Sequence, residues 1–197
     1  MERSYSILVI PPDETSEYIK TRAHRVSHHA KLEPHISLCT SILSEGTDFI
    51  EKVGRRLEGI DPFVFTLERV NRFSSPFAVY LTSSNQSEIE RLKNLHSQIR
   101  LSIGSETKIN GHGGAFLPHL TLDFFPTPKK AIKAKTRYKE LFESPIPFLI
   151  GEVEVSQKIG DKRWKTIEHL RIGKAETALI SLPAMYCFGN NSRASIQ

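Results

Sequence analysis

Cysteine is scarce in this chain, with only Cys39 and Cys187 among its 197 residues. Two cysteines without a Cys-x-x-Cys pair exclude a small scaffold that is held together by disulfides. No apolar run approaches the roughly 20 residues needed to cross a bilayer. The apolar stretch at residues 7–10 stops at Pro11 and is shorter than the usual core of a signal peptide. We therefore expect a cytoplasmic protein without a membrane partner.

Charged residues of both signs are present, with 27 Lys and Arg against 22 Asp and Glu and a formal net charge of +5. A modest positive charge suits an anionic partner such as a nucleotide or RNA. Hydrophobic residues make up 39% of the chain, as is usual for a globular protein. The length fits one domain, or two small lobes that share a core.

Strand-like and helix-like segments alternate along most of the chain without a low-complexity linker. Alternating apolar residues predict strands at residues 4–10, 35–42, 63–70, 77–82, 119–125, 146–156 and 164–172. Helical periodicity and capping signals predict helices at residues 14–30, 49–57, 86–103 and 127–141. This mixture of helices and hairpins predicts an α+β fold with a mainly antiparallel sheet.

A short repeat is the most informative feature of the sequence. Residues 34–38 read Pro-His-Ile-Ser-Leu, and residues 118–122 read Pro-His-Leu-Thr-Leu. A single histidine on a strand is usually a surface residue or a hydrogen-bonded one. The same five-residue pattern recurring 84 positions later is hard to ascribe to chance, so we interpret the two histidines as a functional pair.

Strand geometry places the polar residues of each repeat on one face. Because residues i and i+2 point to the same side of a strand, His35 shares a face with Ser37, and His119 shares a face with Thr121. The same alternation predicts that each polar face continues for one more step, to Cys39 and Asp123.

Two histidines flanked by hydroxyls suit transfer at a phosphate diester. One imidazole can take a proton from the attacking oxygen while the other gives a proton to the leaving oxygen, because histidine titrates near neutral pH. Hydroxyl groups can donate to the nonbridging oxygens as charge builds on them. No closed set of metal ligands is evident, and His24, His28 and His29 are interpreted as a solvated helix face. We expect neither a metal nor a cofactor.

The two His-x-[Ser/Thr]-x motifs, each preceded by proline, resemble those of the two-histidine (2H) phosphoesterases, which include the 2′-5′ RNA ligase group and cyclic phosphodiesterases. The resemblance implies a bilobal domain over residues 1–175, with two mainly antiparallel sheets, flanking helices and a central active-site groove. Residues 176–197 would form a partly flexible C-terminal extension. Ser37 stands where threonine is commoner in the family, and it keeps the hydroxyl.

The resemblance also implies an activity, namely a phosphodiesterase acting on 2′,3′-cyclic phosphates or 2′-5′ linkages of nucleotides or RNA. It favours His119 as the base for water and His35 as the acid for the leaving oxygen, with Ser37 and Thr121 holding the phosphate. The same site run in reverse would join RNA ends, and a non-catalytic RNA-binding module is a further alternative. No obligate protein partner is expected.

Other features are open to two interpretations. Tyr5, Phe73 and Trp164 could stack on a base or pack in the core, and Trp164 is the first choice for stacking, followed by Tyr5. Residues 129–139 carry six Lys or Arg and no acidic residue, which suits either an RNA-facing surface or a solvated helix face. The glycine-rich loop at 110–114 is either a flap or a connector.

Overall fold

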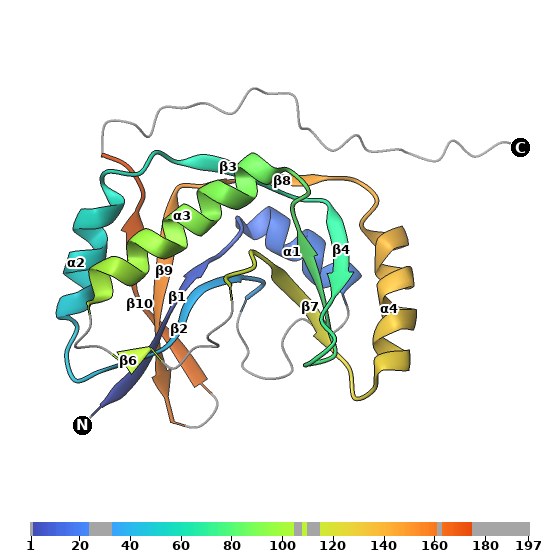
Figure 1. Cartoon of the computed structure of the whole chain (residues 1–197), viewed down its shortest axis with the longest axis horizontal. Helices are drawn as coiled ribbons and strands as arrows, with labels where there is room; N and C mark the ends of the chain where they lie inside the picture. Colours follow the sequence, from blue (N-terminus) through green and yellow to red (C-terminus); the bar gives the residue numbers. More distant parts are fainter. Residues whose placement is uncertain (1, 24–32, 105–107, 110–114, 161–162, 175–197) are drawn as a thin grey trace, which may run out of the picture.

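The computed structural model describes residues 2–23, 33–104, 108–109, 115–160 and 163–174 (Figure 1). Three of the sequence-based expectations lie outside these residues. They concern His24, His28 and His29, the glycine-rich loop 110–114, and the C-terminal extension at 176–197.

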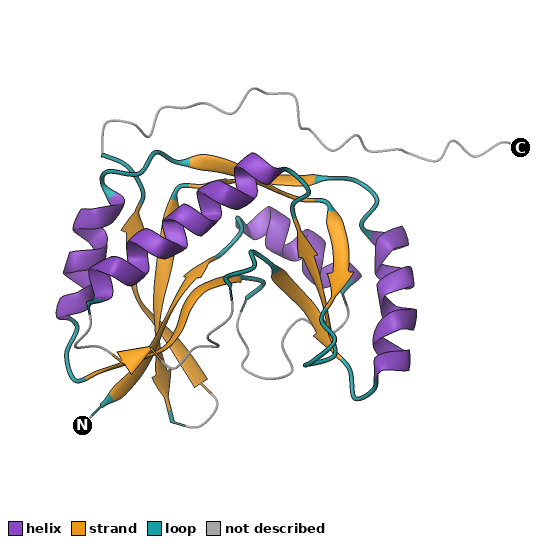
Figure 2. Ribbon diagram, viewed as in Figure 1, coloured by secondary structure: helices purple, strands orange, loops and turns teal. Residues whose placement is uncertain are grey.

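The described chain forms ten strands and four helices, and every strand pair is antiparallel. The helices are α1 (Asp13–Arg22), α2 (Asp48–Leu57), α3 (Gln86–Ile103) and α4 (Pro128–Leu141). The strands are β1 (Arg3–Val9), β2 (Ile36–Ser44), β3 (Phe63–Leu67), β4 (Arg69–Arg72), β5 (Ala78–Thr82), β6 (Lys108–Ile109), β7 (Leu120–Phe124), β8 (Ile146–Ile150), β9 (Glu152–Ile159) and β10 (Arg163–Arg171). The expected α+β class with antiparallel sheets is confirmed (Figure 2).

The larger sheet has the strand order β10-β9-β1-β2-β7-β5-β4, with β6 pairing on β2. Its two halves diverge from the line where β2 meets β7, one half carrying β1, β9 and β10 and the other β5 and β4 (Figure 1). The register between β2 and β7 consists of one pair, Ile36 opposite Leu120. We call these two fully buried residues the junction pair, because they join the two halves.

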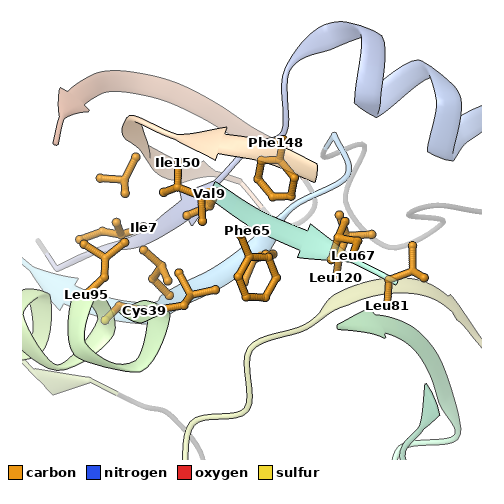
Figure 3. Close-up of a cluster of buried hydrophobic side chains, with 14 of the residues drawn as sticks. Ile7, Val9, Cys39, Phe65, Leu67, Leu81, Leu95, Leu120, Phe148 and Ile150 are labelled. Atoms are coloured by element: carbon orange, nitrogen blue, oxygen red, sulfur yellow. The ribbon is translucent and has the colours of Figure 1, made fainter. Parts of the chain in front are cut away.

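The hydrophobic core lies between the large sheet, the helix α3 and the two-stranded sheet β3-β8. Phe65 and Leu67 of β3 belong to the same buried cluster as Leu81 of β5 and Leu95 of α3 (Figure 3). The β3-β8 sheet therefore shares one hydrophobic core with both halves of the large sheet.

Local sequence signals explain where the helices begin and which face they bury. Phe49, Val53 and Leu57 recur every four residues, and all three are buried on α2 as predicted. The Asn85 side chain accepts hydrogen bonds from the first turn of α3, and Thr127 caps α4. In the described part of the chain, no helix is both long and apolar enough to cross a membrane.

Two of the predicted strands are each divided between the two sheets. The segment 63–70 becomes β3, which pairs with β8, and β4, which pairs with β5. The segment 146–156 likewise becomes β8 and β9, which belong to different sheets. The buried positions explain the division, because the two-residue alternation skips a step between Leu67 and Val70 and between Ile150 and Val153.

Candidate active site

Four polar side chains gather around the junction pair. His35 and Ser37 flank Ile36, and His119 and Thr121 flank Leu120; continuing the antiparallel register by one residue would set His35 across from Thr121 and Ser37 across from His119. Directly opposed residues of neighbouring strands share a face, with Cβ atoms about 4.5–5.5 Å apart. The repeated motif therefore builds a nearly symmetric group of two imidazoles and two hydroxyls from segments distant in sequence.

The two imidazoles are oriented in the same way by the backbone. His35 Nδ1 lies 2.8 Å from the Glu33 carbonyl oxygen, and His119 Nδ1 lies 2.7 Å from the Leu117 carbonyl oxygen. A carbonyl oxygen only accepts, so each Nδ1 carries the hydrogen. In both neutral rings Nε2 is therefore left with its lone pair, ready to take a proton.

Burial is the main influence on both histidines, and it lowers the pKa of His35 and of His119 below the ordinary value near 6.5. The charges around them differ. The carboxylate of Glu154 raises the pKa of His35, whereas the neighbouring His35 lowers the pKa of His119. The near-symmetric pair thus differs in the charges around it, because a carboxylate acts on His35 and a second imidazole acts on His119.

Glu154 reaches the site through strand register. Leu8 of β1 lies opposite Ser37 of β2 on one side and opposite Glu154 of β9 on the other. These three residues consequently share one face of the sheet. The Ser156 hydroxyl donates a hydrogen bond to the Glu154 carboxylate and so fixes its position. Sequence reasoning missed Glu154, which no local motif marks.

Aromatic rings surround His119 on the other half of the sheet. Tyr80 lies opposite Thr121 in the register, and its ring centroid is 5.3 Å from that of His119. The Phe73 ring meets the His119 imidazole edge-on at 4.9 Å, and it also contacts Tyr80 at 4.4 Å. Phe73 was one of the stacking candidates in the sequence, whereas Tyr80 was missed.

The two hydroxyls beside the histidines are available to a ligand. Both Ser37 and Thr121 are half-buried, and neither side chain hydrogen-bonds to another residue in the part of the chain that the structure describes. Because each faces the opposing imidazole, a phosphate held between the rings would find a donor on either side.

Cys39 does not extend the polar face of β2 as expected. Leu8 pairs with Ser37, but the next residue back, Ile7, pairs with Cys39, so an extra residue is inserted at Leu38. Such a bulge reverses the side to which the following residues point. Cys39 is consequently a core residue that is 4% exposed, and burial raises the pKa of its thiol to about 12. A buried, protonated thiol is no nucleophile.

The same irregularity occurs in β7, where it corrects the expectation for Asp123. Tyr80 pairs with Thr121, and Val79 pairs with Asp123, which leaves Leu122 as the extra residue. Asp123 therefore leaves the face of the histidines and lines a pocket on the side of α4. The two motifs thus share a bulge at the same position, and each polar face ends with its hydroxyl residue.

The two preferred base-stacking candidates lie in different environments. Tyr5 is fully buried and packs edge-on against Phe49 at 5.2 Å, so the prediction that it stacks on a base is wrong. Trp164 is partly exposed on β10 opposite Lys158, which shares a sheet face with Glu154. Lys158 and Glu154 are four residues, or about 13 Å, apart along β9. Trp164 could therefore contact only a part of a ligand that is distant from the histidines, and its role stays a prediction.

The described residues include no group of three or more His, Cys, Asp and Glu side chains that could hold a metal ion. Within this part of the chain, the groups that gather at the junction are the two imidazoles, the two hydroxyls and the nearby Glu154 carboxylate. Their chemistry is that of proton transfer and hydrogen bonding to an anion.

Comparisons with known proteins agree with this geometry. The family described as the 2′-5′ RNA ligase superfamily matches residues 11–162. Among solved structures, E. coli LigT in its apo form has a TM-score of 0.56 and 15% identity, over 88% of this chain and 99% of LigT. A protein described as a phosphoesterase has a TM-score of 0.59 and 12% identity, over 88% of this chain and 100% of its own. No curated protein sequence matches.

At such low identities the structural neighbours show the fold alone, and the family match carries the assignment. It spans well over half of the chain and includes both histidine motifs. The protein therefore belongs to the 2′-5′ RNA ligase superfamily, within the two-histidine phosphoesterases.

Proposed function

We propose that this protein is a phosphodiesterase that opens 2′,3′-cyclic phosphates, or cuts 2′-5′ linkages, in nucleotides or RNA. The observation that carries the proposal is the pair of imidazoles with their Nδ1 atoms tied to the backbone and a free hydroxyl opposite each ring. E. coli LigT, which has the same fold, has been crystallised with 3′-AMP. That structure matches this chain with a TM-score of 0.56 and 14% identity, over 87% of this chain and 99% of LigT. A nucleotide ligand is consistent with the proposal.

In the proposed reaction His119 Nε2 takes a proton from water as the water oxygen attacks phosphorus. The bond from phosphorus to the 3′ oxygen breaks in line with this attack, and His35 Nε2 gives its proton to that oxygen. The products are a 2′-phosphate and a free 3′ hydroxyl. Ser37 and Thr121 donate to the nonbridging oxygens, where negative charge increases in the transition state.

The charges around the two histidines support this assignment of roles. An acid must hold its proton until the leaving oxygen needs it, and the Glu154 carboxylate favours the charged form of His35. A base must be neutral, and the nearby His35 disfavours the charged form of His119. Glu154 would then be a positioning residue that acts through His35 rather than a group that touches the substrate.

The proposal is tested by incubating the full chain with nucleoside 2′,3′-cyclic phosphates and 2′-5′-linked dinucleotides in a buffer containing a chelator. We expect turnover of at least one of these substrates, because protons and hydrogen bonds supply the catalysis. Tight binding without turnover would favour the RNA-binding module. Joining of RNA ends without hydrolysis would favour the ligase, and activity only on adding a divalent ion would contradict the mechanism.

The pH dependence of kcat/KM is expected to be bell-shaped, with its maximum on the acid side of about 6.5. Activity falls at low pH as His119 is protonated, and it falls at high pH as His35 loses its proton. Burial lowers the pKa of both rings, so both limbs of the profile move to lower pH. Because the two rings interact, the pKa values read from the limbs belong to the pair and not to single residues.

Replacing Glu154 by glutamine should move the alkaline limb of this profile to still lower pH, because the charge that raises the pKa of His35 is lost. Glutamine keeps an acceptor for Ser156. The matched control is Glu152→Gln on the same strand, which removes a carboxylate that contacts His169 instead. An alkaline limb that stays in place in Glu154→Gln, or moves equally in the control, would remove Glu154 from the mechanism.

A further inference from the structure

A groove of cationic side chains lies between the edge strand β4 and helix α4. It has a volume of about 400 Å³, and Arg69, Lys135 and Lys139 line it. The structure thus divides the basic helix expected from the sequence into two sides. Lys130 and Lys133 line a different pocket, whereas Lys135 and Lys139, one turn apart, face the strand.

The carboxylates in the lining do not pair directly with these cations. The Lys135 ammonium donates to the amide oxygen of Asn71 at 3.0 Å. Arg69, Lys135 and Lys139 form no ion pair within the described part of the chain. Glu68 also lines the groove, but its carboxylate accepts hydrogen bonds from the backbone and the hydroxyl of Ser84.

Neighbouring cations act on the Lys135 ammonium. The pKa of Lys135 is lowered first by burial, and then by the charges of Lys139, Arg72 and Arg69. Glu143 is the other carboxylate in the lining. Three cations against two carboxylates leave the lining positively charged, and a positively charged surface attracts anions.

One row of the sheet leads from Asn71, in the lining of the groove, to the histidine site. Asn71 lies opposite Tyr80, and Tyr80 lies opposite Thr121, so all three share a face. Two strand spacings separate Asn71 from Thr121, about 10 Å. An anion in the groove would therefore be a near neighbour of a phosphate between the histidines, and not the same phosphate.

We propose that the Arg69–Lys135–Lys139 groove binds the backbone phosphates of single-stranded RNA whose reacting phosphate lies between His35 and His119. This rests on the proposed function, and it names the substrate as an oligonucleotide rather than a mononucleotide. A mononucleotide fills the histidine site alone, whereas a chain extends along the sheet row toward β4 and meets the unpaired cations.

The test compares a nucleoside 2′,3′-cyclic phosphate with a short oligoribonucleotide that ends in the same cyclic phosphate, using wild type and the double variant Lys135→Gln/Lys139→Gln. The variant should lose kcat/KM for the oligonucleotide and keep the wild-type value for the mononucleotide. Its salt slope for binding the oligonucleotide, measured by fluorescence anisotropy, should be less steep by about 1.4, since each lost phosphate contact on a single strand removes about 0.7.

The control is Lys52→Gln/Arg55→Gln on α2, which makes the same charge change at the far side of the molecule (Figure 1). It should leave the salt slope unchanged. Equal losses of kcat/KM for the oligonucleotide in both double variants, or no loss in the α4 variant, would contradict the proposed role of the groove. The anisotropy measurement does not depend on turnover, so a failure of the proposed activity can be told apart from a failure of the groove.

Discussion

Replacing His35 or His119 by alanine is expected to lower kcat by about 10²–10⁴, the usual contribution of a positioned acid or base. In the proposed mechanism both rings offer Nε2 to one phosphate, and in the structure each Nδ1 is tied to a backbone carbonyl. The two groups act in one step, so the double variant should lose less than the product of the single losses.

The measurement is kcat on a 2′,3′-cyclic phosphate, with thermal unfolding recorded for each variant. His169→Ala is the matched control, because His169 is an exposed histidine of the same sheet whose Nδ1 lies 3.4 Å from the Glu152 carboxylate. The control should stay close to wild type. Near-normal turnover of His35→Ala or His119→Ala at unchanged stability would remove that residue from the mechanism.

Removing the hydroxyl opposite an imidazole should have the next largest effect. We expect Thr121→Val to lower kcat by about 10²–10³, the loss seen when one donor to a developing oxyanion is deleted. Ser37→Ala should behave in the same way. Binding should change less than kcat, since the hydrogen bond strengthens as charge builds on the phosphate oxygens.

Conservative exchanges separate the hydroxyl from its surroundings. Thr121→Ser and Ser37→Thr keep the donor and should retain most of the activity, which steady-state kinetics on the same substrate will measure. If Thr121→Val were no slower than Thr121→Ser, the hydroxyl would have no part in holding the phosphate, and the loss would reflect packing alone.

Local patterns in the sequence were enough to find the histidine pair and most of the elements. The repeat at residues 34–38 and 118–122 carries its own strand alternation, so the shared faces of His35 with Ser37 and of His119 with Thr121 followed from spacing alone. The buried face of α2 and the start of α4 at Pro128 followed from periodicity and capping. These features depend on neighbours within a few residues.

The errors arose where the strict alternation of a strand is broken. The bulges at Leu38 and Leu122 turn Cys39 and Asp123 away from the histidine face, and no residue type signals them. Tyr5 could have been placed correctly, because it alternates with Ile7 and Val9 and shares their buried face.

Groups brought in by register could not be predicted from the sequence. Glu154 and Tyr80 lie on strands that are distant in the chain from the histidines they influence, and only the order β9-β1-β2-β7-β5 brings them near. Strand order depends on packing between segments that are distant in the sequence. The electrostatic difference between the two histidines therefore emerges only with the structure.

The two-histidine mechanism can be tested by phosphorus NMR of a nucleoside 2′,3′-cyclic phosphate, incubated in chelator with wild type and with each single histidine variant. We expect wild type to convert the cyclic signal into one monoester signal, that of the 2′-phosphate, and neither variant to do so on the same timescale. Conversion that persists in His35→Ala or His119→Ala, or a wild type that leaves the cyclic phosphate intact, would contradict it.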